Sequence, residues 1–196
     1  VITANSQTCH LFTSDRELSS TMINKIYQDR NNMIWIATED GLNRYDGSKF
    51  TIYKNNPNDT YSLCNNYVKT IFEDSKGRLF IGTHNGVQMY NPATDKFSKK
   101  ALLPNSKPFE SNIIDIIERS NGELWVSGNI LCTLEVKGEE LYVKHIDLPI
   151  PPFFCDDIVE DKDNNMWISD EVNCIFRISP VNKIKRYVNN ESSLAI

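Results

Sequence analysis

Residues that commonly perform chemistry are few in this chain, and they are widely separated. The 196 residues include five cysteines and three histidines. No two cysteines form a Cys-x-x-Cys pair and the histidines are far apart, so the spacing of a zinc site is missing. We therefore expect no metal site and no cofactor. The residues concerned are Cys9, Cys64, Cys132, Cys155, Cys174, His10, His84 and His145.

Carboxylates are plentiful, but three of them recur at one position of a repeated unit. Asp29, Asp74 and Asp161 each precede a polar turn. An aspartate caps such a turn by accepting hydrogen bonds from the backbone just after it, whereas a catalytic carboxylate would occur once. The sequence also lacks Gly-x-Ser-x-Gly, His-Glu-x-x-His and phosphate-loop motifs. These observations predict that the chain is not an enzyme and has no catalytic residue.

The repeated unit is about 45 residues long. Its anchor is an aromatic residue at positions 35, 80, 125 and 167, with spacings of 45, 45 and 42 residues. An isoleucine precedes each anchor by nine positions, and a small residue follows it by two. The anchors are Trp35, Phe80, Trp125 and Trp167, and the isoleucines are Ile26, Ile71, Ile116 and Ile158. Because aliphatic residues flank every anchor, we expect the tryptophans to be core residues and not sugar-stacking platforms.

Three cysteines fall at aliphatic positions of this repeat. Cys155 aligns with Ile23, while Cys132 and Cys174 both align with Leu42. A free cysteine packs as a small buried hydrophobe, whereas a reactive thiol needs a basic and exposed setting. We expect these three thiols to be buried. The alignment does not place Cys9 and Cys64.

Each unit carries the pattern of four short antiparallel strands. The segments "INKIYQD" and "IWIAT" are rich in β-branched and aromatic residues, and a polar turn separates them. No window has the helical apolar period together with caps. Units of this length with four strands indicate an all-β fold of β-propeller blades. The expected division is a lone N-terminal strand at 1–17, blades at 18–61, 62–104, 105–150 and 151–190, and the start of a fifth blade at 191–196.

The loops between the second and third strands are the candidate binding sites. In a propeller these loops open on one face together with the connections from the fourth strand to the next first strand. They vary from unit to unit and carry groups that bind sugar hydroxyls, although an ordinary solvated loop residue is the commoner interpretation of each. The candidate ligand-binding residues are Glu39, Asp40, Arg44, His84, Asn85, Asn129, Asp170 and Glu171.

The first two units resemble the two-component regulator propeller repeat. That repeat reads approximately Leu-Ser-x-Asn-x-Val-x-x-Ile-x-x-Asp-x-x-Gly-x-Leu-Trp-Ile-Gly-Thr-x-x-Gly-Leu. The matching residues in the first unit are Leu18, Ser19, Ile23, Ile26, Asp29, Trp35, Ile36, Thr38, Gly41 and Leu42. Those in the second unit are Leu63, Asn66, Val68, Ile71, Asp74, Gly77, Leu79, Ile81, Gly82, Thr83 and Gly86.

The resemblance implies the N-terminal part of the periplasmic sensor region of a hybrid two-component system. The blades would then be an incomplete part of a seven-bladed propeller, and the histidine kinase would lie elsewhere in the parent protein. The ligand of such a sensor is typically an oligosaccharide. The alternative is a structural or protein-interaction propeller that sets the geometry of a dimer.

Charge and hydropathy exclude other classes of partner. The net charge of −5 argues against a nucleic-acid surface, which requires a basic stripe. No apolar run approaches the ~18 residues of a membrane helix. An arc of four blades would present an apolar flank at each end, so we expect self-association through exposed blade edges.

Overall fold

The computed structural model describes residues 17–146, 155–170 and 174–188. All regular elements in these ranges are strands, and they form four separate four-stranded antiparallel sheets. In each sheet the strands pair in chain order, which confirms the predicted all-β fold of propeller blades. The expected strand at 1–17, except for its last residue, and the expected start of a fifth blade at 191–196 lie outside the described residues.

The four sheets are named blades 1 to 4 in chain order. Blade 1 consists of β1 (Ile23–Gln28), β2 (Ile34–Thr38), β3 (Gly41–Tyr45) and β4 (Phe50–Tyr53). Blade 2 consists of β5 (Val68–Glu73), β6 (Leu79–Thr83), β7 (Gly86–Asn91) and β8 (Lys96–Phe97). Blade 3 consists of β9 (Ile113–Glu118), β10 (Leu124–Gly128), β11 (Cys132–Lys137) and β12 (Glu140–His145). Blade 4 consists of β13 (Cys155–Glu160), β14 (Met166–Asp170), β15 (Cys174–Ile178) and β16 (Ile184–Val188).

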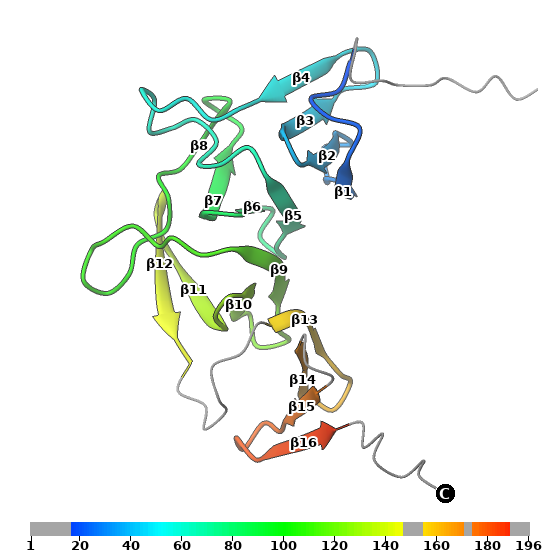
Figure 1. The fold of residues 1–196 in the computed structure, drawn as a ribbon, viewed down its shortest axis with the longest axis vertical. Coiled ribbons are helices and arrows are strands. Elements are labelled where there is room, and N and C mark those ends of the chain that lie inside the picture. Colours follow the sequence, from blue (N-terminus) through cyan, green and yellow to red (C-terminus); the bar gives the residue numbers. More distant parts are fainter. Residues whose placement is uncertain (1–16, 147–154, 171–173, 189–196) are drawn as a thin grey trace, which may run out of the picture.

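The blades follow one another along an arc. The first strands β1, β5, β9 and β13 line one side of this arc, and the fourth strands lie on the opposite side (Figure 1). Each first strand pairs with its second strand through an irregularity in register near the same position. Such a bulge increases the local twist of the strand, and it recurs in all four blades.

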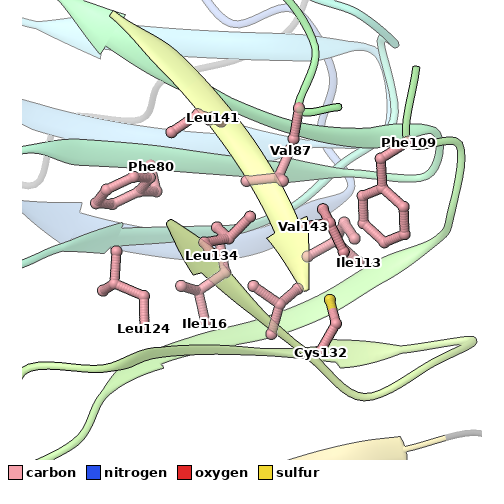
Figure 2. Close-up of a cluster of buried hydrophobic side chains, with 12 residues drawn as sticks. Phe80, Val87, Phe109, Ile113, Ile116, Leu124, Cys132, Leu134, Leu141 and Val143 are labelled. Atoms are coloured by element: carbon pink, nitrogen blue, oxygen red, sulfur yellow. The ribbon is translucent and has the colours of Figure 1, made fainter. Parts of the chain in front are cut away.

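Hydrophobic cores lie between successive blades. Trp35 of blade 1 shares a cluster with Val68 and Ile71 of blade 2. Phe80 of blade 2 belongs to one cluster with Ile113 and Ile116 of blade 3 (Figure 2). The anchors of blades 1 and 2 thus pack on the first strand of the next blade. Trp125 continues the pattern with blade 4.

The two flanks of the arc lack this cover in the described part of the chain. Ile26 has an exposed fraction of 61%, although its equivalent Ile71 has only 1%. At the other flank Trp167 is half-buried, while Val159 and Ile175 are exposed. The expectation of a core position therefore holds for Trp35 and Trp125 but was too strong for Trp167. The physical reason is that no described residue of a later blade covers the Trp167 ring.

The recurring aspartates fix the anchor side chains. Asp29 Oδ2 accepts a hydrogen bond from Trp35 Nε1 at 2.7 Å, and Asp161 Oδ2 accepts one from Trp167 Nε1 at the same distance. The other oxygen of each carboxylate accepts backbone N–H groups of the turn. This geometry confirms the predicted structural role of the aspartates and adds the indole as a partner.

In blades 2 and 3 one member of the tryptophan–aspartate pair is replaced by another residue. Phe80 has no N–H group, and Asp74 instead binds the guanidinium of Arg78, which lies over the Phe80 ring. In blade 3 an arginine occupies the aspartate position, and Arg119 lies over the ring of Trp125, 5.2 Å from its centroid. A cation over the ring thus supports the anchor where the indole–aspartate bond is missing.

A glutamate at the end of the first strand of blades 2, 3 and 4 binds the preceding blade. Glu73 accepts the backbone N–H of Arg30 at 3.1 Å and pairs with its guanidinium at 2.7 Å. Glu118 accepts the N–H of Ser75 at 2.7 Å, and Glu160 repeats the contact with blade 3. These charge-assisted bonds fix the distance between turns of adjacent blades.

One contact reaches beyond the adjacent blade. Lys25 Nζ donates to Thr70 Oγ1 of blade 2 at 3.1 Å and to Asp115 Oδ1 of blade 3 at 3.2 Å. Thr70 Oγ1 also lies 3.2 Å from Asp115 Oδ1. The first strands of three blades are therefore joined through polar side chains on one side of the arc.

The cysteines in the described residues are free thiols, and three of them are fully buried. Burial raises the pKa of Cys132 and of Cys155 to about 12. The predicted burial of Cys132, Cys155 and Cys174 is confirmed, but the alignment of two of them was off by one residue. Leu42 pairs with Ala37, two residues after its anchor, whereas Cys132 pairs with Val126, one residue after Trp125. In blade 4 the residue that pairs with Ser169, two after the anchor, is Ile175 and not Cys174, because the loops before β11 and β15 are longer than the loop before β3.

Cys174 pairs with Val188 of β16. Cys64 has a different setting from the three buried cysteines. Cys64 follows Leu63 as Ser19 follows Leu18. Its Sγ lies 3.2 Å from Thr83 Oγ1, just as Ser19 Oγ lies 2.9 Å from a threonine hydroxyl. Cys64 is thus a serine replacement within the repeat.

Burial between blades predicts unequal effects of one substitution at equivalent positions. Ile71→Ala should lower the free energy of unfolding by about 2–4 kcal/mol, because it leaves a cavity between blades 1 and 2. Ile26→Ala removes the same atoms from an exposed position and should cost less than about 1 kcal/mol. Urea denaturation of both variants measures the difference. Equal losses would contradict packing between successive blades.

The indole–aspartate bond predicts acid sensitivity. The hydrogen bond from Trp167 lowers the pKa of Asp161 from 3.8 to about 2. A lowered carboxyl pKa contributes stability that is present above pH 3.8 and is lost as the pH falls toward 2. Asp161→Asn should therefore be less stable than the parent at neutral pH, and the gap should narrow on acidification. Denaturation midpoints between pH 6 and pH 2 test this, and a gap independent of pH would refute it.

Candidate functional site

The loops between second and third strands lie beside the segments that enter the next blade. Gly41 N donates to Asn66 O at 2.7 Å, and Gly86 N donates to Ser111 O at 2.8 Å. Both acceptors stand two residues before the first strand of the following blade. The two kinds of connection therefore share one edge of the sheets, here called the loop face.

On the loop face the structure brings together three of the expected site residues at the junction of blades 1 and 2. Asp40 binds Lys54 Nζ at 2.6 Å and Asn66 Nδ2 at 3.1 Å. Glu39 accepts the hydroxyl of Tyr67 at 2.9 Å, and the Tyr67 ring lies 5.6 Å from the ring of His84. The result is an aromatic ring surrounded by hydrogen-bonding groups of both polarities.

Sequence reasoning missed the residues that the entering segment contributes to this cluster. Asn66 and Tyr67 stand just before the first strand of blade 2, and Lys69 follows within it. Lys69 Nζ lies 4.6 Å from the centroid of the Tyr67 ring. Their position in the sequence could have identified them, because a residue one or two positions before a first strand must lie on the same face as the expected loops.

The other expected loop residues lie on later blades or serve their own turns. Asn85 N donates to Thr83 Oγ1 at 3.1 Å, and Asn129 is exposed on blade 3. Asp170 ends β14, and its Oδ1 accepts the Cys174 N–H at 2.8 Å. Glu171 lies outside the described residues.

Arg44 does not join the loop face. It lies near the far end of β3, and its guanidinium is 5.6 Å from the ring centroids of Trp35 and Tyr53. It pairs with Asp95 at 2.8 Å and contacts the hydroxyl of Tyr90. Arg44 thus belongs to a contact between blades 1 and 2 on the opposite edge of the sheets.

Burial and the carboxylate of Asp95 determine the pKa values in this contact around Arg44. Burial, together with hydrogen bonding to Asp95, raises the pKa of Tyr53, and it raises that of Tyr90 to about 12. Burial alone would raise the pKa of Asp95, but hydrogen bonds from both tyrosines and the charge of Arg44 lower it. The two phenols therefore remain protonated donors to one carboxylate, which suits a structural role.

A cavity of about 670 Å³ lies at the edge that carries the β5–β6, β7–β8 and β11–β12 turns. Its lining comes from blades 2 and 3 and includes Tyr61, Met89, Phe97, Lys99 and Glu139. None of the seven expected site residues that the structure describes lines this cavity. In an antiparallel sheet these turns lie opposite the loop face, so the described residues present candidate sites on two separate edges of the sheets.

The described residues show no other recognisable chemical centre. In residues 17–146, 155–170 and 174–188, no group of three or more histidine, cysteine, aspartate or glutamate side chains could hold a metal ion. A search of the same residues finds no helix long and apolar enough to cross a membrane.

Comparison with protein families places two-component regulator propeller repeats in the chain. The model of the family described as "Two component regulator propeller" matches residues 17–40 and 62–85. The matched stretches contain β1 with β2, and β5 with β6. Parts of blades 1 and 2 are thus similar to the two-component regulator propeller repeat.

A curated relative shares part of the sequence. Histidine kinase P4 from Formosa agariphila is 44% identical over 52 residues, which are 26% of this chain and 4% of that protein. The chain therefore corresponds to a small fraction of the length of this relative.

Solved structures share the fold. The extracellular domain of BT4673 from B. thetaiotaomicron, described as a hybrid two component system, has a TM-score of 0.76 at 19% identity over 94% of this chain and 28% of its own. Virginiamycin B lyase from Staphylococcus aureus has a TM-score of 0.63 at 18% identity over 92% of this chain and 59% of its own. At these identities the similarity establishes the propeller fold, which a sensor domain and an enzyme share.

We predict that polar residues on the loop face can be replaced without unfolding the chain. Asp40→Ala removes an ion pair whose side chains are 51% and 45% exposed, so the loss should be under about 1 kcal/mol. Glu73→Ala is the contrasting variant, since its side chain is 5% exposed and binds Arg30, and it should cost about 2 kcal/mol or more. Urea denaturation compares them, and a larger loss for Asp40→Ala would show that the loop face is structural.

Proposed function

We propose that this chain is a non-catalytic sensor segment from the periplasmic region of a hybrid two-component signalling protein. Its proposed contribution is oligosaccharide sensing, with the histidine kinase elsewhere in the parent protein. The regulator propeller repeats at 17–40 and 62–85 support this proposal. The shared fold with an extracellular domain of a hybrid system and the local identity to a histidine kinase point in the same direction.

The observation that carries the proposal is the cluster on the loop face around Tyr67. Sugar recognition needs an apolar surface for the ring faces together with donors and acceptors for the hydroxyls. Tyr67 offers the ring, Glu39 and Asp40 offer acceptors, and Lys69 offers a donor within 4.6 Å of the ring centroid. His84 adds an exposed imidazole beside the same ring.

The proposed site extends along the loop face to later blades. Asn85, Asn129, Asp170 and Glu171 would contact further sugar units of a longer chain. The proposed blades span residues 18–61, 62–104, 105–150 and 151–190 of an incomplete seven-bladed propeller. In this arrangement the strands hold the loops, and the loop residues differ from blade to blade.

A second candidate function is a scaffold that sets the geometry of a dimer. The observation that favours it is the pair of apolar flanks, with Ile26 at 61% exposure on one and Val159 at 57% on the other. Apolar surface of this kind favours association between copies. Light scattering separates the two functions, because a scaffold should dimerise without a ligand and a sensor should respond to one.

Oligosaccharide binding should be measurable by calorimetry on the 196-residue chain. We expect saturable heat from at least one of cellohexaose, mannohexaose and a chondroitin hexasaccharide. Tyr67→Ala and Glu39→Gln should each weaken that binding about tenfold, since each removes a central contact. Glu135→Gln, a 60% exposed carboxylate on β11, is the matched control and should bind like the parent. Absence of binding to all three sugars, or unaltered binding by both loop variants, would refute the proposal.

A further inference from the structure

The cavity between blades 2 and 3 has a lining that the proposed sensor function does not use. Its volume of about 670 Å³ falls within the range of small-molecule sites, roughly 300–1,000 Å³. It lies at the edge of the sheets that carries the β5–β6, β7–β8 and β11–β12 turns, opposite the loop face. Its lining divides into an apolar floor and two walls of opposite charge.

The apolar floor comes from blade 2 and the segment that leads into it. Met89 and Phe97 lie on β7 and β8, and Tyr61 adds a ring that is 45% exposed. The backbone of Tyr61 is held on both sides, because its N–H donates to Asp59 Oδ1 and its carbonyl accepts the Phe97 N–H, both at 3.0 Å. The ring is therefore presented on a fixed support and needs little ordering when a ligand binds.

The basic wall belongs to blade 2, and one of its cations has no acidic partner. Arg78 pairs with Asp74, and Lys96 pairs with Asp59 at 3.0 Å. In the part of the chain that the structure describes, no ion pair engages Lys99. Lys99 is thus the cation of this wall whose charge is available to a ligand.

The acidic wall belongs to the β11–β12 turn of blade 3. Glu139 accepts a hydrogen bond from Asn91 Nδ2 at 3.0 Å, and Glu140 accepts one from the Tyr142 hydroxyl at 2.5 Å. Neither carboxylate has a cationic partner among the described residues, and no ion pair joins either to Lys99 across the cavity. Two negative charges on one blade therefore face a positive charge on the other.

We propose that this cavity binds a small zwitterionic ligand with an apolar body, namely a short apolar peptide with free termini. The ammonium group would lie against Glu139 and Glu140, and the carboxylate against Lys99. The apolar side chains would cover Tyr61 and Met89. A ligand with separated charges satisfies both walls at once, whereas a purely anionic or cationic ligand would be repelled by one of them.

The proposal is tested by calorimetry on the 196-residue chain with the dipeptide Leu-Phe and its capped analogue N-acetyl-Leu-Phe-amide. Leu-Phe should bind saturably, and the capped analogue should bind about tenfold more weakly, because it lacks both charges. Lys99→Gln and the double variant Glu139→Gln/Glu140→Gln should each weaken Leu-Phe about tenfold and leave the capped analogue unchanged. Tyr61→Ala should weaken both peptides.

Matched controls and a competing ligand class complete the experiment. Lys183→Gln and Glu135→Gln change the same charges on other surfaces and should bind Leu-Phe like the parent. Equal affinity for the free and capped peptides, no binding of Leu-Phe, or binding insensitive to the wall variants would overturn the proposal. Binding of cellotetraose that is lost in Tyr61→Ala would overturn it as well and would identify a neutral sugar site. All of these results are independent of the loop face, which Tyr67→Ala tests.

Discussion

The whole arrangement depends on the burial of one aromatic side chain per blade against the first strand of the next blade. A four-stranded sheet has two faces and cannot cover either of them by itself. Trp35, Phe80 and Trp125 solve this problem by reaching into the following blade. The turn aspartates aim the indoles, and the glutamates at the ends of the first strands fix the spacing. Stability of this kind is a sum over neighbouring pairs, which tolerates divergence elsewhere in each unit.

The features that the sequence alone could predict are those that recur because every blade packs against its neighbour in the same way. Ile71, Ile116 and Ile158 are buried because each faces the preceding blade, and this constraint returns with every unit. The turn position of Asp29 is equally regular. The register of Cys132 was not predictable to the residue, because the loop before it differs in length from those in blades 1 and 2. The repeat period predicts where a strand lies, but it does not predict how many residues the loop before that strand contains.

The candidate sites were harder to predict because they join segments that no repeat relates. Arg44 was expected beside Asp40, but its partner Asp95 lies 51 residues away at the other edge of the sheets. Tyr67 was missed because it belongs to the segment that enters blade 2 and not to a loop between second and third strands. The cavity has a similar origin: β8 has two residues, while β11 and β12 have six each, and the long hairpin stands beside a short neighbour. Such a mismatch is visible only when the blades are placed side by side.

The contact of Lys25 with both Thr70 and Asp115 has a consequence for how such a molecule can evolve. Most interactions join adjacent units, so a duplicated repeat could be inserted anywhere and find suitable neighbours. An insertion between blades 1 and 3, however, would move the ammonium group one unit away from its carboxylate. Duplication of a repeat within these three units should therefore be tolerated less well than it would be if all repeats were interchangeable. The number of blades between Lys25 and Asp115 is itself under constraint.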